Sequence, residues 1–201
     1  MRVDLKRRRC RTNPRLPSAD TLLAMEVARW AEERGLPMID LGGAFNSPAG
    51  YTSVDLQDAD VNCNIREGLP FETSSVGVVR ASDFLEHIPH CVDSSCTHDA
   101  PFCTVGMMNE IHRVLVPEGW FLSYTPSTDG RGAFQDPSHC SFWNPNSFWY
   151  YCQTEQRKYV RNLTAEFAAI RVWQEYPSPW HEQHHILYVG ARLRAVKQPT
   201  T

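Results

Sequence analysis

The sequence predicts an α/β fold built on a mostly parallel sheet. Short apolar, β-branched runs alternate with segments whose apolar residues recur at helical spacing. Two glycines follow the first of these runs directly, which is typical of a strand that ends in a tight turn. The last two runs are separated only by a loop, so we expect an antiparallel strand at or near one edge of the sheet.

The first half of the chain contains one predicted helix and most of the predicted parallel strands. The helix is expected over 19–34, because Leu23, Val27 and Trp30 recur at helical spacing and Gly35 follows where a helix would end. Each predicted strand is a short run of apolar or β-branched residues. These strands are 38–41, 51–55, 60–63 and 76–81.

The second half begins with a helix predicted over 107–115, where Met108, Ile111 and Leu115 share one face and Pro117 marks the end. The segment 126–151 is rich in proline and aromatic residues and is too long for a simple connector, which favours a functional role. The other elements expected here are a strand at 120–125, a helix near 154–162 and strands near 166–174 and 186–194.

Length, composition and charge favour one globular domain with a basic arm. The chain has 201 residues, is 42% hydrophobic and has a net charge of -3, and residues 1–15 alone carry a net charge of +6. We expect a flexible arm over 1–17, a single domain over 18–195 and a tail over 196–201. The arm is a possible nucleic-acid contact, although a solvated tail is the favoured interpretation.

The sequence also bears on the cellular compartment. It contains neither a signal peptide nor an apolar run of the roughly 18–20 residues that cross a bilayer, so no membrane association is predicted. The number of cysteines is odd, seven in all, which favours free thiols in a reducing compartment. A cytoplasmic protein is therefore expected.

Polar chemistry is concentrated where the first two predicted strands end. Asp40 and Leu41 lead into Gly42 and Gly43, and glycines at this place let a ligand approach the backbone closely. Asp55 closes the next strand, where a carboxylate can accept hydrogen bonds from both hydroxyls of a ribose.

In their order and spacing, these segments resemble the motifs of class I, Rossmann-like methyltransferases that use S-adenosyl-L-methionine (SAM), in a compact branch similar to methyltransferase type 11. The resemblance implies a three-layer Rossmann-like fold, SAM as cofactor and methyl transfer as the reaction. It covers about 38–150. The segments that carry it are Ile39–Ala44, Gly50–Asp55, Leu69–Phe71, Val76–Ala81, Phe84–Ile88, Asn109–Trp120 and Asp136–His139, with Phe142, Trp143, Phe148 and Trp149 behind the last of them.

The resemblance also implies roles for single residues. Asp40 and the glycine turn (Gly42, Gly43 and Ala44) belong to the cofactor site, with the turn against the methionine moiety and the ribose. Asp55 holds the ribose hydroxyls, and Leu56 packs on the adenine. The remaining implied contacts are Asn64 at the adenine amino group, the backbone N–H of Ile65, and Ser82 and Asp83 beside the methyl group.

The chain departs from the family pattern in three places. Ala44 stands where the family has its second or third loop glycine, and Asn64 replaces an acidic residue, although an amide oxygen can still accept a hydrogen bond. The turn from Gly42 to Gly50 is too short for a full helical crossover, so the first helix of the family is expected to be vestigial. We expect these changes to affect the affinity for the cofactor more than they affect the fold.

Methyl transfer from a sulfonium mainly requires alignment of the acceptor, and a general base is needed only for a protonated nucleophile. The candidate acid–base residues are Asp83, Glu86, His87 and His139. The aromatic cluster of 142–151 is either a roof over the acceptor or part of the core, and core packing is favoured.

Three other signals are set aside. His181 to His185 matches the H-E-x-x-H zinc-protease pattern, but the preceding prolines and the following strand favour an extended chain. The cysteine- and histidine-rich segment 87–103 lacks the C-x2-C spacing of a structural zinc site, so no metal site is predicted. Ser82-Asp83-Phe84-Leu85 lacks the Pro-Pro-aromatic and Pro-Cys motifs of base-modifying DNA methyltransferases.

The leading interpretation is an active methyltransferase on a small-molecule or sugar-like acceptor. One alternative is a binding module that keeps the fold without turnover, which Ala44 and the absence of an obvious base favour. The other is a nucleic-acid-associated methyltransferase that uses residues 1–15 for phosphate contacts.

Overall fold

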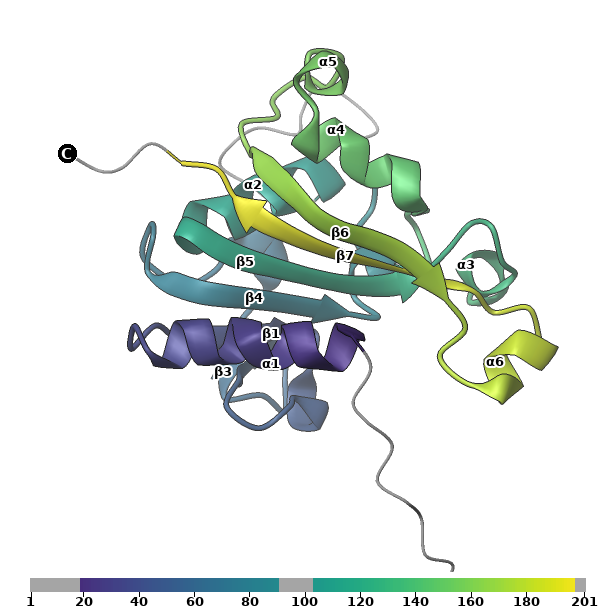
Figure 1. The fold of residues 1–201 in the computed structure, drawn as a ribbon, viewed down its shortest axis with the longest axis horizontal. Coiled ribbons are helices and arrows are strands. Elements are labelled where there is room, and N and C mark those ends of the chain that lie inside the picture. Colours follow the sequence, from purple (N-terminus) through teal and green to yellow (C-terminus); the bar gives the residue numbers. More distant parts are fainter. Residues whose placement is uncertain (1–18, 91–102, 198–201) are drawn as a thin grey trace, which may run out of the picture.

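The computed structural model describes residues 19–90 and 103–197, so the basic arm and most of the cysteine- and histidine-rich segment lie outside the described residues. Within these ranges seven strands form one sheet in the order β3-β2-β1-β4-β5-β7-β6. The strands from β3 to β5 run parallel, and β7 runs antiparallel to both of its neighbours (Figure 1). The predicted α/β fold with an antiparallel strand near one edge is confirmed. The strands are β1 (Met38–Leu41), β2 (Thr52–Asp55), β3 (Val61–Asn62), β4 (Val76–Ser82), β5 (Leu115–Pro126), β6 (Phe167–Glu175) and β7 (Tyr188–Ala195).

Helices lie on both faces of the sheet and complete a three-layer arrangement (Figure 1). On one face, Val27 and Ala31 of α1 (Ala19–Glu32) pack against Val78. On the other, α2 (Thr104–Val114) packs against the cluster that contains Val79. Neighbouring strand residues therefore enter different cores, as side-chain alternation requires. None of the helices in the described ranges has the length and apolar character needed to cross a membrane.

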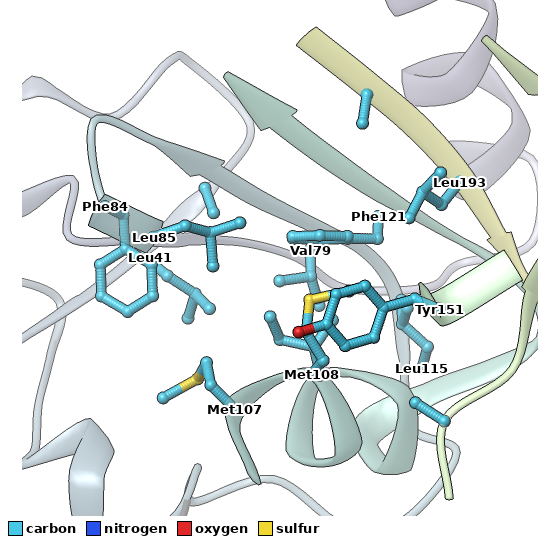
Figure 2. Close-up of a cluster of buried hydrophobic side chains, with 14 of the residues drawn as sticks. Leu41, Val79, Phe84, Leu85, Met107, Met108, Leu115, Phe121, Tyr151 and Leu193 are labelled. Carbon is cyan, nitrogen blue, oxygen red and sulfur yellow. The ribbon is translucent and has the colours of Figure 1, made fainter. Parts of the chain in front are cut away.

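The larger core lies between the sheet and α2 (Figure 2). Met108 points from the helix toward Val79 and Phe121 of the central strands, whereas Met107 points toward Leu41 of β1. All five side chains are fully buried. Methionine side chains are flexible and fill irregular gaps in a core, so these two neighbouring residues can pack against different strands of the sheet. The shorter helices are η1 (Ala44–Asn46), η2 (Ile65–Glu67), η3 (Leu85–His87), α3 (Gly132–Gln135), η4 (Pro145–Phe148), α4 (Trp149–Cys152), α5 (Thr154–Arg157) and α6 (Pro179–Gln183).

Two predicted elements differ from the structure after position 150. The helix expected near 154–162 is only the short α5, because Asn109 bonds to the backbone beyond it. Its amide donates to the Asn162 carbonyl at 2.7 Å and accepts from the Thr164 N–H at 2.9 Å, which fastens the turns after α5 to α2. The expectation of no helix between the last two strands is also wrong. Ser178 caps α6 and Pro179 occupies its first position, which are standard helix-start signals.

The crossover from β1 to β2 confirms the expectation of a vestigial first helix. The connection contains only the three-residue 3-10 helix η1. Ala44 begins this turn with a φ of 41°, in the left-handed region that costs a residue with a Cβ roughly 1–2 kcal/mol. The turn therefore stores strain at the position of Ala44.

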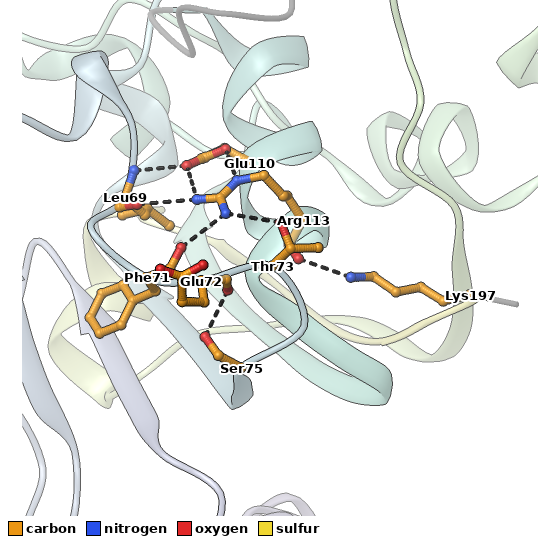
Figure 3. A network of polar contacts seen from close by, with 8 residues as sticks. All are labelled: Leu69, Phe71, Glu72, Thr73, Ser75, Glu110, Arg113 and Lys197. Carbon is orange, nitrogen blue, oxygen red and sulfur yellow. Dashed lines mark hydrogen bonds and ion pairs between the residues drawn. The ribbon is translucent and has the colours of Figure 1, made fainter. Parts of the chain in front are cut away.

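A polar network fastens the loop before β4 to α2 (Figure 3). Arg113 pairs with Glu110 at 2.7 Å and donates to the carbonyls of Phe71 and Leu69. Glu110 also accepts from the Leu69 N–H at 2.8 Å, and Lys197 donates to the Arg113 carbonyl at 3.0 Å. Burial raises the pKa of Glu110, but these hydrogen bonds outweigh burial and hold its pKa below the usual value of 4.5.

We expect Glu110→Gln to lower the free energy of unfolding by about 1–2 kcal/mol at pH 7, a value discounted because Arg113 is partly exposed. Since the folded pKa is depressed, the stabilisation is complete above about pH 4.5 and is lost as the pH falls through the folded pKa. Denaturant unfolding at several pH values should therefore show wild type and variant converging in acid. The control Glu155→Gln removes an exposed pair with Lys158 and should change stability by less than about 0.5 kcal/mol. A pH-independent difference for Glu110→Gln would contradict this account.

We expect Ala44→Gly to leave stability unchanged or to raise it by up to about 1 kcal/mol, because relief of the left-handed strain exceeds the added entropy of glycine. Ala49→Gly, in the same loop but without a positive φ, is the matched control and should lower the free energy of unfolding by about 0.4–1 kcal/mol. Equal losses in both variants, measured by denaturant unfolding, would show that Ala44 is not strained.

Candidate functional site

A cavity of about 500 Å³ opens at the carboxyl edge of the parallel strands. The chain proceeds from β1 to β3 in one direction across the sheet and then places β4 on the other side of β1. Such a switch point is where open α/β sheets bind ligands, and the volume is in the usual range for small-molecule sites. The cavity is lined by Asp55, Leu56, Asn64, Ile65, Arg66, Phe84, His87 and Ile88.

Four of the predicted cofactor residues line this cavity together. Asp55 ends β2, and its Oδ1 accepts from the Leu56 N–H at 2.6 Å. The Leu56 side chain is 67% exposed, so it offers an apolar surface to a ligand at the rim. Ile65 is buried, and the fourth residue, Asn64, lies directly before it.

Asn64 is engaged in local structure. Its side-chain oxygen accepts from the Arg66 N–H at 3.2 Å and thereby caps η2, while its amide nitrogen donates to Glu67 at 2.7 Å. Both ends of the amide therefore stabilise the turn after β3. A ligand that used this oxygen would share it with the cap.

The two glycines after β1 are required by their immediate neighbours. Gly42 has a φ of 73°, and a Cβ there would lie 2.8 Å from the Phe84 ring, which forms one wall of the cavity. A Cβ on Gly43 would lie 2.2 Å from both Asp40 and Ser47. Because these two glycines have no Cβ, Phe84 can pack against Gly42, and the hydrogen bond between Asp40 and Ser47 can form beside Gly43.

Asp40 is fully buried and both of its oxygens have partners. Oδ1 pairs with Arg80 at 2.6 Å, and Oδ2 accepts from the Ser47 hydroxyl at 2.8 Å. The carboxylate thus connects β1, β4 and the glycine turn. Arg80 is not among the residues predicted from the sequence, although a single charge inside the apolar run of β4 signals a buried partner.

The remaining predicted cofactor residues line other hollows. Ala44 borders a hollow of about 460 Å³ between the loops that follow β1 and β2, together with Ser53 and Asp60. Ser82, at the end of β4, borders a hollow of about 350 Å³ beside Arg80 and Tyr124. Neither residue lines the cavity at the switch point in this structure.

Three of the four predicted acid–base candidates lie close together. Glu86, His87 and His139 each place one carboxylate oxygen or ring nitrogen within 4.8 Å of the others. Burial raises the pKa of Glu86. Asp83 instead is exposed and accepts from the Tyr188 hydroxyl at 2.8 Å, and burial together with Asp83 raises the pKa of Tyr188. Of these candidates only His87 lines the cavity at the switch point.

The aromatic residues of 142–151 divide into two groups. Trp143, Phe148 and Tyr151 are buried in the core, as the core-packing interpretation predicts. Burial raises the pKa of Tyr151 to about 12. Phe142, Trp149 and Tyr150 are more than a third exposed. A hollow of about 440 Å³ is lined by members of both groups, with His90 at its edge.

The signals set aside in the sequence have local explanations. The H-E-x-x-H segment begins inside α6, which corrects the expectation of an extended chain, and its histidines bond to neighbours such as Ser178 and the Trp180 carbonyl. No metal-ligand cluster among the described residues includes this segment. Cys63, Cys140 and Cys152 are free, but Cys103 is disulfide-bonded, so the expectation of free thiols throughout is wrong.

Comparison with known proteins identifies the fold. No family model and no curated protein sequence matches the chain. A SAM-dependent methyltransferase of Methanosarcina mazei is 13% identical, with a TM-score of 0.53 over 81% of this chain and 93% of that one. The YcgJ protein of Bacillus subtilis is 11% identical, with a TM-score of 0.50 over 88% of this chain and all of that one. With its strand order and switch-point cavity, the chain has the Rossmann-like fold of the class I SAM-dependent methyltransferases.

Proposed function

We propose that this protein is a SAM-dependent methyltransferase whose cofactor occupies the cavity at the switch point. The observation that carries the proposal is that Asp55, Leu56, Asn64 and Ile65, which come from the ends of two strands, line one cavity of suitable volume. The fit is best for the nucleoside half of the cofactor. A carboxylate at the end of β2 suits two ribose hydroxyls, and the exposed Leu56 side chain suits an adenine face.

In this proposal the residues around the cavity have distinct tasks. Asp55 accepts hydrogen bonds from the ribose, Leu56 packs on the adenine and the Ile65 N–H donates to it. Gly42 and Gly43 keep the turn after β1 free of side chains, while Asp40 holds that turn in place through Ser47. Phe84 closes the cavity against Gly42 and excludes water from that side.

When bound, SAM supplies a methyl group already activated by the positive sulfur. The chain then has to hold the acceptor in line with that methyl group and keep water out, and such alignment is worth several kcal/mol of the barrier. If the acceptor starts protonated, His87 is the best-placed base, because it is the acid–base candidate that lines the cavity.

We further propose a small-molecule or sugar-like acceptor. The aromatic-lined hollow of about 440 Å³ supports this, since side chains such as Phe142 and Tyr150 offer flat apolar surfaces to a small ring. The cytoplasmic location and the nucleic-acid-associated alternative remain proposals from the sequence, and the latter depends on residues 1–15, which are outside the described ranges.

A second candidate function is a binding module that keeps the fold without methyl transfer. Two observations favour it. Ala44 holds a strained left-handed conformation where the family has glycine, and the Asn64 amide is engaged by Arg66 and Glu67. Both features weaken a cofactor contact that the family relies on.

The test is calorimetric titration of the protein with SAM and with S-adenosylhomocysteine. We expect micromolar binding of both ligands, and we expect Asp55→Ala to weaken it by about 10–100-fold, because hydrogen bonds to a charged group contribute roughly 1.5–3 kcal/mol. Glu155→Ala, which removes an exposed carboxylate from α5, is the control and should leave binding unchanged.

If Asp55→Ala binds SAM as tightly as the wild type, the cofactor does not occupy this cavity. Failure of the wild-type protein to bind either ligand would favour the binding module. Micromolar binding would justify a screen of hydroxyl-bearing small molecules for methyl transfer.

A further inference from the structure

We propose that Glu86, His87 and His139 form a binding site for a divalent transition-metal ion beside the switch-point cavity. The side chains come from two separate segments: η3, which follows β4, and the loop that precedes η4. One donor atom of each lies within 4.8 Å of the others, and two imidazoles with one carboxylate are a common ligand set for Zn²⁺ and Fe²⁺. No metal is predicted from the sequence, because its spacing does not reveal that the two segments meet.

The backbone fixes the two segments against each other. The N–H groups of Cys140 and Ser141 both donate to the Glu86 carbonyl, at 2.8 and 3.0 Å. The Ser141 hydroxyl donates to the Leu85 carbonyl at 2.7 Å and accepts from the Trp143 indole at 2.8 Å. His139 is therefore held next to η3 by bonds that do not involve the three side chains. The cluster is a built feature of the fold.

Within the described residues, each histidine has a partner for one ring nitrogen and none for the other. Nδ1 of His139 lies 3.1 Å from the Ala133 carbonyl, which can only accept, so Nδ1 carries the proton and Nε2 has the lone pair. Asp136 is 4.0 Å from that Nε2, too far for a hydrogen bond. Nδ1 of His87 faces Ser138, 3.3 Å from a hydroxyl oxygen whose own proton goes to Asp136.

The two carboxylate oxygens of Glu86 also differ in whether they have a hydrogen-bond partner. Oε2 accepts from the Thr125 hydroxyl at 2.7 Å, whereas Oε1 is buried without a hydrogen-bond partner in the described part of the chain. The residue is only 2% exposed. A buried carboxylate oxygen with no partner is costly, and a cation would satisfy it. Metal ligands typically have their second polar atom oriented in this way by a neighbouring group.

The spacing is compatible with an ion after small side-chain movements. Ligands of a tetrahedral Zn²⁺ lie roughly 3.4 Å apart when each bond is about 2.1 Å. Donor atoms within 4.8 Å of one another therefore need to approach by at most about 1.4 Å, which side-chain torsions can supply. Three protein ligands leave at least one open position, as in catalytic rather than structural sites.

The position of the cluster suggests what that open position would hold. Because His87 lines the switch-point cavity, the ion would face the space beside the proposed methyl donor. There it would bind the hydroxyl oxygen of an acceptor and lower the pKa of that hydroxyl, so that its proton passes to water. The resulting oxyanion would form the new O–C bond to the methyl group as the S–C bond breaks and the sulfur keeps the electron pair. This role rests on the proposed function, whereas the metal site itself does not.

The site is tested by calorimetric titration of chelator-treated protein with Zn²⁺ alone, without SAM. We expect one ion per chain. Glu86→Gln and His139→Ala should each weaken binding by at least about 100-fold, since loss of a ligand exceeds the 10–100-fold effect of losing a partner behind it. Thr125→Val, which removes only the partner of Glu86, should weaken binding by about 10–100-fold.

Two controls separate this site from other zinc ligands. Cys140→Ser removes the free thiol next to His139, and His184→Ala removes an exposed histidine of the H-E-x-x-H segment, and both should bind Zn²⁺ like the wild type. Thermal unfolding of every variant without metal checks that it folds. The visible spectrum of the Co²⁺-substituted protein should change in His139→Ala.

The proposal would be overturned if the wild type does not bind Zn²⁺. It would also be overturned if Glu86→Gln and His139→Ala bind Zn²⁺ as tightly as the wild type. Titration with SAM in the presence of chelator is scored separately. SAM binding without Zn²⁺ binding would refute the metal site and leave the proposed function standing. Zn²⁺ binding without SAM binding would support the metal site and refute the proposed function.

Discussion

An ion pair between the buried Asp40 and the partly exposed Arg80 joins the two central strands where the chain changes direction across the sheet. The two residues are direct partners in the register of β1 and β4, and their side chains meet at 2.6 Å. Removal of Arg80 would leave the buried carboxylate of Asp40 poorly compensated inside the fold, which is strongly unfavourable. The pair therefore fixes the register of β1 against β4, and that register sets the relative height of the loops that form the cavity.

The same carboxylate shapes the turn that follows β1. Through Ser47 it holds the residues after Gly43, and the contact fits only because Gly43 has no Cβ. This arrangement replaces the crossover helix that the short connection cannot accommodate. The strain at Ala44 is a local consequence, because a turn of this length has to reverse direction within a few residues.

Most of the fold could be predicted from the sequence because its strands are buried, short and separated by clear turn signals. The strands at 38–41 and 76–81 are examples, since burial on both faces produces a continuous apolar run. The prediction failed where distant side chains decide the structure. Asn109 fastens the turns after α5 from more than forty residues away, and local propensity does not contain this information.

The candidate site was predictable to a smaller extent. Asp55, Leu56, Asn64 and Ile65 line one cavity because they lie at or just after the ends of β2 and β3, and parallel strands end at the same edge. Ala44 and Ser82 also lie near or at the ends of strands, but they border hollows elsewhere. The role of Arg80 could have been inferred from its isolation in an apolar strand. The proximity of His139 to Glu86 could not, since it depends on how a long irregular loop folds back.

The segment 84–88 links the cavity to the cluster of Glu86, His87 and His139. Phe84 packs against Gly42 and forms one wall of the cavity, while the next two residues bind the loop that carries His139. His87 belongs to both features, because it lines the cavity and contributes to the cluster. A shift of this segment would therefore change the cavity and the donor geometry together. An ion held by the cluster would in turn restrain the cavity wall, so metal and nucleoside binding are expected to be coupled, and linkage requires each to change the affinity of the other by the same factor.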